Sequence, residues 1–117
     1  MRLIKTVKVK TGAGGIAANK GSTSIRFNYF DTSFMFLNCH LASGQKEHAE
    51  RFSNLELCYS ETVSAFHNSD IERRPRAFDN LILMGDMNWR VDLPYHEAVN
   101  LANQNKVEDL KAGDELL

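Results

Sequence analysis

Residues 81–90, LILMGDMNWR, decide the fold. Four apolar residues that do not alternate with polar ones run directly into Gly85 and Asp86. Such a run predicts a strand over residues 80–86 that is buried on both faces, in a layered sheet. Polar residues at the exit of a buried strand lie where ligands of α/β proteins usually bind.

Asp86, Asn88 and Arg90 follow this strand at two-residue spacing, which on an extended backbone projects side chains to one side, about 6–7 Å apart. Asp86 could then accept a proton from an attacking water, and Asn88 could stabilise an oxyanion. Arg90 could present its planar fork to a phosphate. Gly85, without a side chain, would let a ligand approach the backbone. The alternative is that Asp86 and Asn88 only cap a turn.

A second strand exit also carries polar residues. Residues 22–30 and 34–40 predict a hairpin around a turn at 31–33. The period of two places Asn38 and His40 on one strand face, after two phenylalanines. His40 suits acid–base work or a phosphate contact, although a histidine at a strand end can equally be structural.

The first residues of the chain predict a strand over 2–9 and a glycine-rich loop over 10–21. The loop could cradle an anion with its backbone N–H groups, or it could be a plain connector. Within it, Lys20 is a candidate for a basic rim facing an anionic surface, and a solvated strand face is the alternative. The other lysines of that rim are Lys5, Lys8 and Lys10.

Residues 44–67 predict a helix, N-capped by Ser43, with one apolar stripe. The stripe consists of Phe52, Leu55, Tyr59, Val63 and Phe66. Residues 72–76, ERRPR, predict an exposed basic loop. Pro94 occupies the first position of a second helix over 94–104, and the last twelve residues predict another helical turn or two.

Length and composition restrict the class of protein. A chain of 117 residues forms at most one domain, and 43% hydrophobic with 25% charged residues is typical of a globular protein. A net charge of −1 gives no global basic field for nucleic acid. Cys39 and Cys58 lack zinc-site spacing and predict two reduced thiols. The alternation of strands and helices predicts a layered α/β fold.

Three motifs, in order, resemble those of the inositol polyphosphate 5-phosphatases. VKTGAGGIAANKGSTSIRF is similar to the family's glycine-rich segment, which ends in Asn-Lys-Gly before a strand. FLNCHLASGQKEHAER is similar to its Ser-His-Leu strand end and the helix that follows, with Cys39 in place of the serine. LILMGDMNWRVDL is similar to its Gly-Asp-x-Asn-aromatic-Arg signature. Gly-Asp-x-Asn alone is shared with deoxyribonuclease I and abasic endonucleases.

The resemblance implies a deoxyribonuclease I-like fold, with two packed sheets flanked by helices. It implies magnesium-dependent hydrolysis of the 5-position phosphate of inositol polyphosphates or phosphoinositide lipids. Asp86 would be the base that activates water, Asn88 would hold that water or the phosphate, and His40 would lie against the scissile phosphate.

The resemblance also assigns substrate-binding residues. Asn19 and Lys20 would meet the headgroup or the membrane surface, and Arg90 would orient the site. The substrates place such an enzyme in the cytoplasm, peripherally associated with membranes, and no nucleic-acid partner is expected.

The family's metal-binding Glu would lie before residue 1, and its Pro-x-Trp-Cys-Asp-Arg motif and late Asp-His pair would lie after residue 117. We therefore expect residues 1–117 to be the central part of one catalytic domain, truncated at both ends, without a metal ligand, and marginally stable and inactive alone. A catalytically dead phosphoinositide-binding module and a metal-dependent endonuclease remain alternatives.

Overall fold

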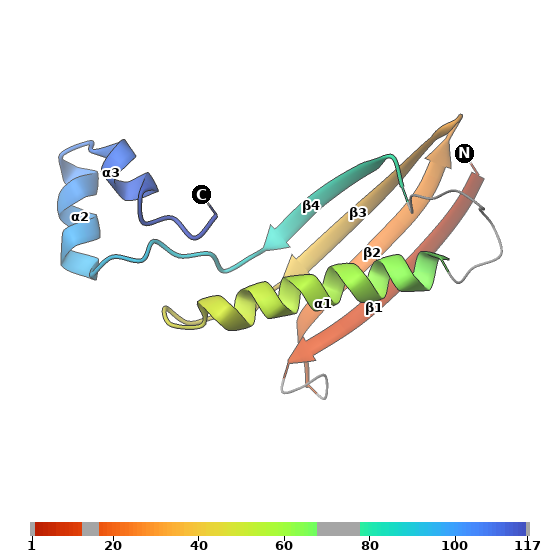
Figure 1. The fold of residues 1–117 in the computed structure, drawn as a ribbon, viewed down its shortest axis with the longest axis horizontal. Coiled ribbons are helices and arrows are strands. Elements are labelled where there is room, and N and C mark those ends of the chain that lie inside the picture. The colour runs from red at the N-terminus through yellow and green to blue at the C-terminus, as the bar shows by residue number, and fades with distance from the viewer. Residues whose placement is uncertain (1, 13–16, 68–77, 117) are drawn as a thin grey trace.

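A computed structural model describes residues 2–12, 17–67 and 78–116. One four-stranded sheet is covered on one face by a long helix, and two short helices follow the last strand (Figure 1). The strands are β1 (Arg2–Gly12), β2 (Ala17–Tyr29), β3 (Thr32–His40) and β4 (Asn80–Asp86). The helices are α1 (His48–His67), α2 (Tyr95–Asn103) and α3 (Val107–Lys111). The predicted α/β class is confirmed.

The sheet has the order β1-β2-β3-β4. The first three strands are antiparallel, and β4 runs parallel to β3. In the β3–β4 register, Leu37 pairs with Leu83 and His40 pairs with Asp86. Because parallel strands in register end at one edge of a sheet, both polar strand exits lie side by side.

The predicted hairpin is confirmed, with a shorter turn: Tyr29 pairs with Thr32, and Phe30 takes a positive φ of 51° between them. The loop predicted over 10–21 is wrong in extent, because β1 continues to Gly12 and β2 begins at Ala17. Pairing with the neighbouring strand overrides the weak strand propensity of glycine and asparagine there. Residues 13–16, the centre of the predicted loop, lie outside the described residues, as do residues 72–76.

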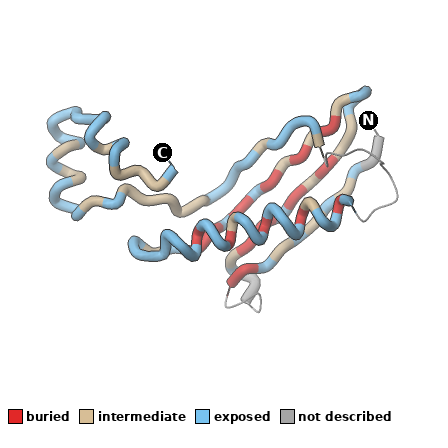
Figure 2. The backbone as a smooth tube through the Cα atoms, viewed as in Figure 1, coloured by how far each residue is buried: buried red, intermediate tan, exposed pale blue. Residues whose placement is uncertain are grey.

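The core lies between the sheet and α1. Side chains of β3 alternate: Met35, Leu37 and Cys39 are buried in the core with residues of α1, while Asn38 and His40 are exposed. The same alternation of burial colours runs along the strands of the sheet (Figure 2). Both cysteines are free and buried, as predicted. A hydrogen bond with Cys58 and burial both raise the pKa of the Cys39 thiol.

The apolar stripe predicted for α1 is only partly correct. Phe66 is buried, and Leu55 and Val63 pack against the core, but Phe52 and Tyr59 are exposed. The residues that α1 buries most deeply are largely polar: Arg51, Asn54, Cys58, Thr62 and Phe66. The helix is therefore turned so that Phe52 and Tyr59 lie at the flank of the face that it buries.

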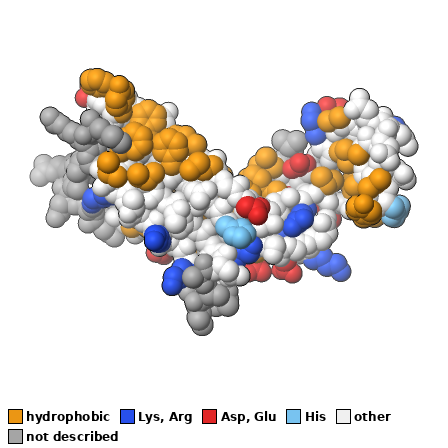
Figure 3. All heavy atoms as spheres, turned by 180° about the vertical axis from the view of Figure 1, so that it is seen from behind, with side chains coloured by type: hydrophobic (Ala, Val, Ile, Leu, Met, Phe, Trp, Pro, Cys, Tyr) orange, Lys and Arg blue, Asp and Glu red, His pale blue; other side chains and the backbone are white. Residues whose placement is uncertain are grey.

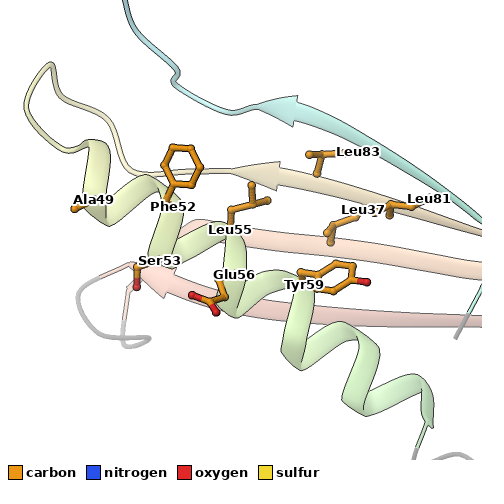
Figure 4. A pocket seen from close by; sticks show the side chains of 9 residues that line it. All are labelled: Leu37, Ala49, Phe52, Ser53, Leu55, Glu56, Tyr59, Leu81 and Leu83. Carbon is orange, nitrogen blue, oxygen red and sulfur yellow. The ribbon is translucent and has the colours of Figure 1, made fainter. Parts of the chain in front are cut away.

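The strand over 80–86 forms as predicted, but it is not buried on both faces. Leu81, Leu83 and Met84 of β4 are 40%, 38% and 45% exposed. The reason is its place in the sheet: β4 is an edge strand paired with β3 alone, and α1 lies over β1, β2 and β3. Leu81 and Leu83 line an open apolar groove of about 640 Å³ beside α1 (Figure 4).

Two expected helix starts are shifted. Ser43 is not the N-cap of α1, which begins at His48 after a turn. Pro94 is the N-cap of α2 with φ −56° and ψ 139°, one position before the one predicted. Proline's fixed φ suits either position, so the sequence could not distinguish them. Among the described residues, no helix has both the length and the apolarity needed to cross a bilayer.

Candidate functional site

His40 and Asp86 end neighbouring strands and face each other. His40 Nε2 lies 3.7 Å from Asp86 Oδ2, and the two side chains are 52% and 64% exposed. Their direct pairing in the β3–β4 register sets this approach. The two strand exits therefore bring the candidate residues His40 and Asp86 to one place.

Lys20 joins the same cluster from β2. Its Nζ lies 2.7 Å from His40 Nε2. Gly21, the next residue, pairs with His40 and has a positive φ of 141°. An added Cβ at this position would collide with the carbonyl oxygen of Val9, so only glycine lets β1 and β2 approach here. The Asn-Lys-Gly sequence thus delivers the ammonium group to the histidine.

Asn88 does not continue the strand, contrary to the extended backbone expected for it. It has a positive φ of 53°, and its backbone N–H donates to Asp86 Oδ1 at 3.0 Å. This is the turn-capping geometry considered as the alternative. The cap does not remove Asp86 from the site, because the other carboxylate oxygen still faces His40.

The Asn88 side chain connects the two strand exits. Its Nδ2 donates to the carbonyl oxygen of Leu41 at 3.0 Å, and its Oδ1 accepts from Arg90 Nη2 at 3.2 Å. One amide N–H is therefore committed to the loop after His40. Arg90 is hydrogen-bonded to the oxygen of the same amide. Five of the six predicted site residues are thus linked by direct contacts: Lys20, His40, Asp86, Asn88 and Arg90.

Gly85 has a different role from the one predicted. Its φ is 115°, and an added Cβ would collide with the carbonyl oxygen of Cys39. The glycine is required by the close approach of β3, and its missing side chain does not open a path for a ligand.

Asn19, the sixth predicted residue, lies in a polar groove of about 430 Å³ next to His40. Lys8 and Lys10 of β1 line the same groove, whereas Lys5, another lysine of the predicted basic rim, is not among its lining residues. Seen from the face that α1 does not cover, a histidine lies among basic and acidic side chains, and a hydrophobic area occupies the far end of the sheet (Figure 3). Stacked Phe27, Phe34 and Phe36 belong to this apolar end.

The charge balance suits an anion. The linked cluster contains two basic side chains, Lys20 and Arg90, and a histidine, against the one carboxylate of Asp86. Magnesium is usually held by one or two carboxylates with water and substrate oxygens, but no group of three His, Cys, Asp or Glu residues gathers anywhere in the described ranges. These residues therefore fit a phosphate and do not complete a metal centre.

The sequence reasoning missed two residues next to this site, Arg51 and Glu115. They form a buried bidentate ion pair, and hydrogen bonds from Arg51 lower the pKa of the Glu115 carboxyl. An arginine at helical spacing from Asn54, Cys58 and Thr62 was the available signal, because these four share the face that α1 turns to the core.

The chain is similar to proteins that carry phosphatase names. It is 32% identical over 129 residues to a probable inositol polyphosphate 5-phosphatase of Schizosaccharomyces pombe, covering 100% of this chain and 11% of that protein. It is 34% identical over 119 residues to human phosphatidylinositol 3,4,5-trisphosphate 5-phosphatase 2, covering 97% of this chain and 9% of that protein. The chain thus spans about a tenth of the length of these relatives.

A solved structure has the same fold. It is the inositol polyphosphate 5-phosphatase domain of SPsynaptojanin, in complex with inositol (1,4)-bisphosphate and calcium ion. The TM-score is 0.73 at 29% sequence identity, and the match covers 98% of this chain and 32% of that one. The deoxyribonuclease I-like architecture implied by the motifs is thereby supported for this part of the sheet and its helices.

A family-level match covers the whole sequence. The sequence model of endonuclease/exonuclease/phosphatase family 2 matches residues 1–117. Together with the phosphatase relatives and the shared fold, this match settles the family. The chain belongs to endonuclease/exonuclease/phosphatase family 2.

Proposed function

We propose that residues 1–117 are the central part of one catalytic domain of an inositol polyphosphate or phosphoinositide 5-phosphatase. The observation that carries the proposal is the convergence of Lys20, His40 and Asp86 at one edge of the sheet, with Asn88 and Arg90 beside them. The names of the relatives support the same reaction class.

In this proposal Lys20 and His40 bind the phosphate, and the carboxylate of Asp86 accepts the proton. Lys20 and His40 contact the scissile phosphate and balance the charge that develops on its oxygens. Asp86 accepts a proton from the attacking water, whose oxygen forms the new bond to phosphorus as the bond to the inositol oxygen breaks; that oxygen leaves as a hydroxyl after taking up a proton, which restores the Asp86 carboxylate by way of solvent. Asn88 holds that water or a phosphate oxygen with its remaining amide N–H, and Arg90 fixes the orientation of Asn88.

The groove next to His40 accepts the rest of the substrate. Asn19 lies in it, together with the ammonium groups of Lys8 and Lys10. Their positive charge favours a polyphosphorylated headgroup, free or on an anionic membrane surface. This reading gives the parent protein a peripheral, cytoplasmic place at the membrane.

Magnesium is the cofactor we propose for the complete domain. When bound, such an ion would polarise the phosphate and help lower the pKa of the attacking water. Because the described residues do not complete a ligand set, the steps assigned above involve only this chain's own side chains.

The test is phosphate release by the full-length parent protein carrying Asp86→Ala. We expect kcat for an inositol polyphosphate to fall well beyond tenfold, with a smaller change in KM, because a base acts in the transition state. Asp109→Ala on exposed α3 is the matched control and should leave kcat unchanged. Unchanged turnover in Asp86→Ala would remove Asp86 as the base.

The same protein distinguishes the alternatives. Headgroup binding without any turnover by the wild-type parent would indicate a binding module. Cleavage of DNA with no release of inositol-bound phosphate would indicate an endonuclease.

A further inference from the structure

The side chain of Arg51 is fully buried at the beginning of α1, at 0% exposure. Its Nε donates to Glu115 Oε2 at 2.8 Å, and its Nη2 donates to Glu115 Oε1. A third donor, Nη1, reaches the carbonyl oxygen of Gly44 at 2.5 Å. A buried guanidinium costs free energy unless its donors are satisfied, so this set of partners defines one orientation of the side chain.

Glu115 holds a second piece of backbone. Its Oε2 also accepts the backbone N–H of Arg90 at 3.2 Å, and its own N–H donates to the Arg90 carbonyl at 3.1 Å. Val91 forms a β-bridge with Asp114, and Asp92 N–H donates to the carbonyl of Gly113 at 2.6 Å. The Glu115 carboxylate therefore lies where residues 90–92 are hydrogen-bonded to residues 113–115.

The two backbone pieces are the continuations of the two strands that carry the site. Gly44 belongs to the loop after His40, and Arg90 belongs to the turn after Asp86. The Asn88 amide spans the same gap through its hydrogen bond to Leu41. The ion pair thus connects the loop after β3 with the turn after β4, and the Asn88 side chain connects the same two segments.

We infer that the Arg51–Glu115 ion pair positions the phosphate-binding site by fixing the loop after β3 relative to the turn after β4. Neither side chain touches His40 or Asp86, so both are positioning residues. The inference deepens the proposed function and rests on it for the identity of the ligand.

Stability alone does not explain the choice of an ion pair. Apolar side chains of similar volume can replace a buried ion pair at no cost in stability, whereas a planar bidentate pair also fixes direction. Here the fixed direction is transmitted to one backbone group on each strand exit, the carbonyl oxygen of Gly44 and the N–H of Arg90. Displacement of either would move the Asn88 amide relative to His40.

The experiment is an NMR titration of the 117-residue chain with inorganic phosphate and, separately, with inositol 1,4-bisphosphate. Three variants are compared with the wild type: Glu115→Gln, Arg51→Lys, and the apolar double variant Arg51→Met/Glu115→Leu. The matched control is Glu108→Gln, which removes an exposed ion pair with Lys111 of 2.8 Å on the same C-terminal segment. Thermal melts of all variants report stability separately.

We expect the Asn88 side-chain amide and the Arg90 resonances to shift in all three variants and phosphate affinity to fall at least fivefold. In the double variant, this loss should occur with a melting temperature close to that of the wild type. Glu108→Gln should change neither. Wild-type affinity and unshifted Asn88 and Arg90 resonances in a folded double variant would overturn the inference.

The outcomes for the two proposals are distinguishable. If the wild-type chain binds neither probe, the phosphate-binding role proposed for this site fails. The Asn88 and Arg90 resonances still decide whether the ion pair sets their geometry.

Discussion

The two strands that carry the site, β3 and β4, run parallel and in register, yet one is buried and the other is exposed. Leu37 and Leu83 are register partners on the same sheet face; Leu37 is 1% exposed and Leu83 is 38% exposed. The difference is the cover, because α1 lies over β3 and not over β4. The ends of the two strands do not differ in this way. His40 and Asp86 are both exposed and lie 3.7 Å apart, although one strand is buried and the other is not. The register between β3 and β4 therefore brings His40 and Asp86 together, whereas the packing of α1 over β3 decides which of the two strands contributes to stability.

The largest effect expected from this contrast is in the core. Leu37→Ala should lower the free energy of unfolding by about 2–5 kcal/mol, because it leaves a cavity between β3 and α1. Leu83→Ala, the matched control one strand away, should cost much less, since its side chain is already 38% exposed. Urea denaturation of both variants measures the difference. Equal losses would show that Leu83 is covered in solution.

The next largest effect concerns the pH dependence of the stability that the buried Arg51–Glu115 ion pair provides. Arg51 lowers the pKa of Glu115 in the folded state, below the ordinary value of about 4.3. The unfolded chain therefore takes up this proton first as the pH falls. The stabilisation is fully present above that ordinary value and is lost as the pH falls through the lowered pKa of the folded state.

Glu115→Gln mimics the protonated side chain and isolates this contribution. At pH 7 the variant should be about 1.5–3 kcal/mol less stable than the wild type, the usual range for hydrogen bonds to charged groups. At pH 3, which is below the ordinary glutamate pKa of about 4.3, the gap should narrow, because the unfolded wild-type chain is then largely protonated and part of the stabilisation is lost. Urea denaturation at both pH values tests the sign. A gap that widens in acid would contradict the assignment.

These comparisons also show how far the sequence could be read. The strand–turn–strand pattern and the period-2 faces of β3 were readable because each depends on local alternation. The cluster of His40, Asp86 and Lys20 was expected from strand exits and motif resemblance, and register then brought the three together. The exposure of β4 could not be predicted, because a continuous apolar run indicates that a strand tends to be buried but does not identify the element that would bury it.

The Arg51–Glu115 ion pair could not be predicted from the sequence. Arg51 and Glu115 are 64 residues apart, and no local period connects them. The turn at Asn88 was ambiguous for a different reason: an Asp-x-Asn sequence is compatible with both an extended and a turned backbone. Only the hydrogen bond from its N–H to Asp86 decides between the two.

Gly85 tests the contact between β3 and β4 directly. Gly85→Ala should destabilise the chain by more than about 1 kcal/mol, because φ is 115° and the new Cβ would collide with the Cys39 carbonyl. Gly113→Ala is the control; its added Cβ would first meet the side chains of Leu93 and Val91, at 3.2 and 3.3 Å, and the backbone nitrogen of Asp92 at 3.6 Å, an ordinary contact distance. Thermal melts should show a clear loss for the first and a small change for the second. A stable Gly85→Ala variant would mean that β4 lies farther from β3.

The smallest effect on folding is expected on the open side of β4. Leu83→Lys should change the free energy of unfolding by no more than about 0.5 kcal/mol, because the ammonium group can reach solvent from the groove beside α1. Self-association should nevertheless decrease, since a charge next to an unpaired strand edge discourages edge-to-edge pairing. Thermal melts and sedimentation velocity measure the two effects separately. If Leu83→Lys instead lowers the free energy of unfolding as much as Leu37→Ala is expected to do, the groove is filled in solution and the contrast between the two strands does not hold.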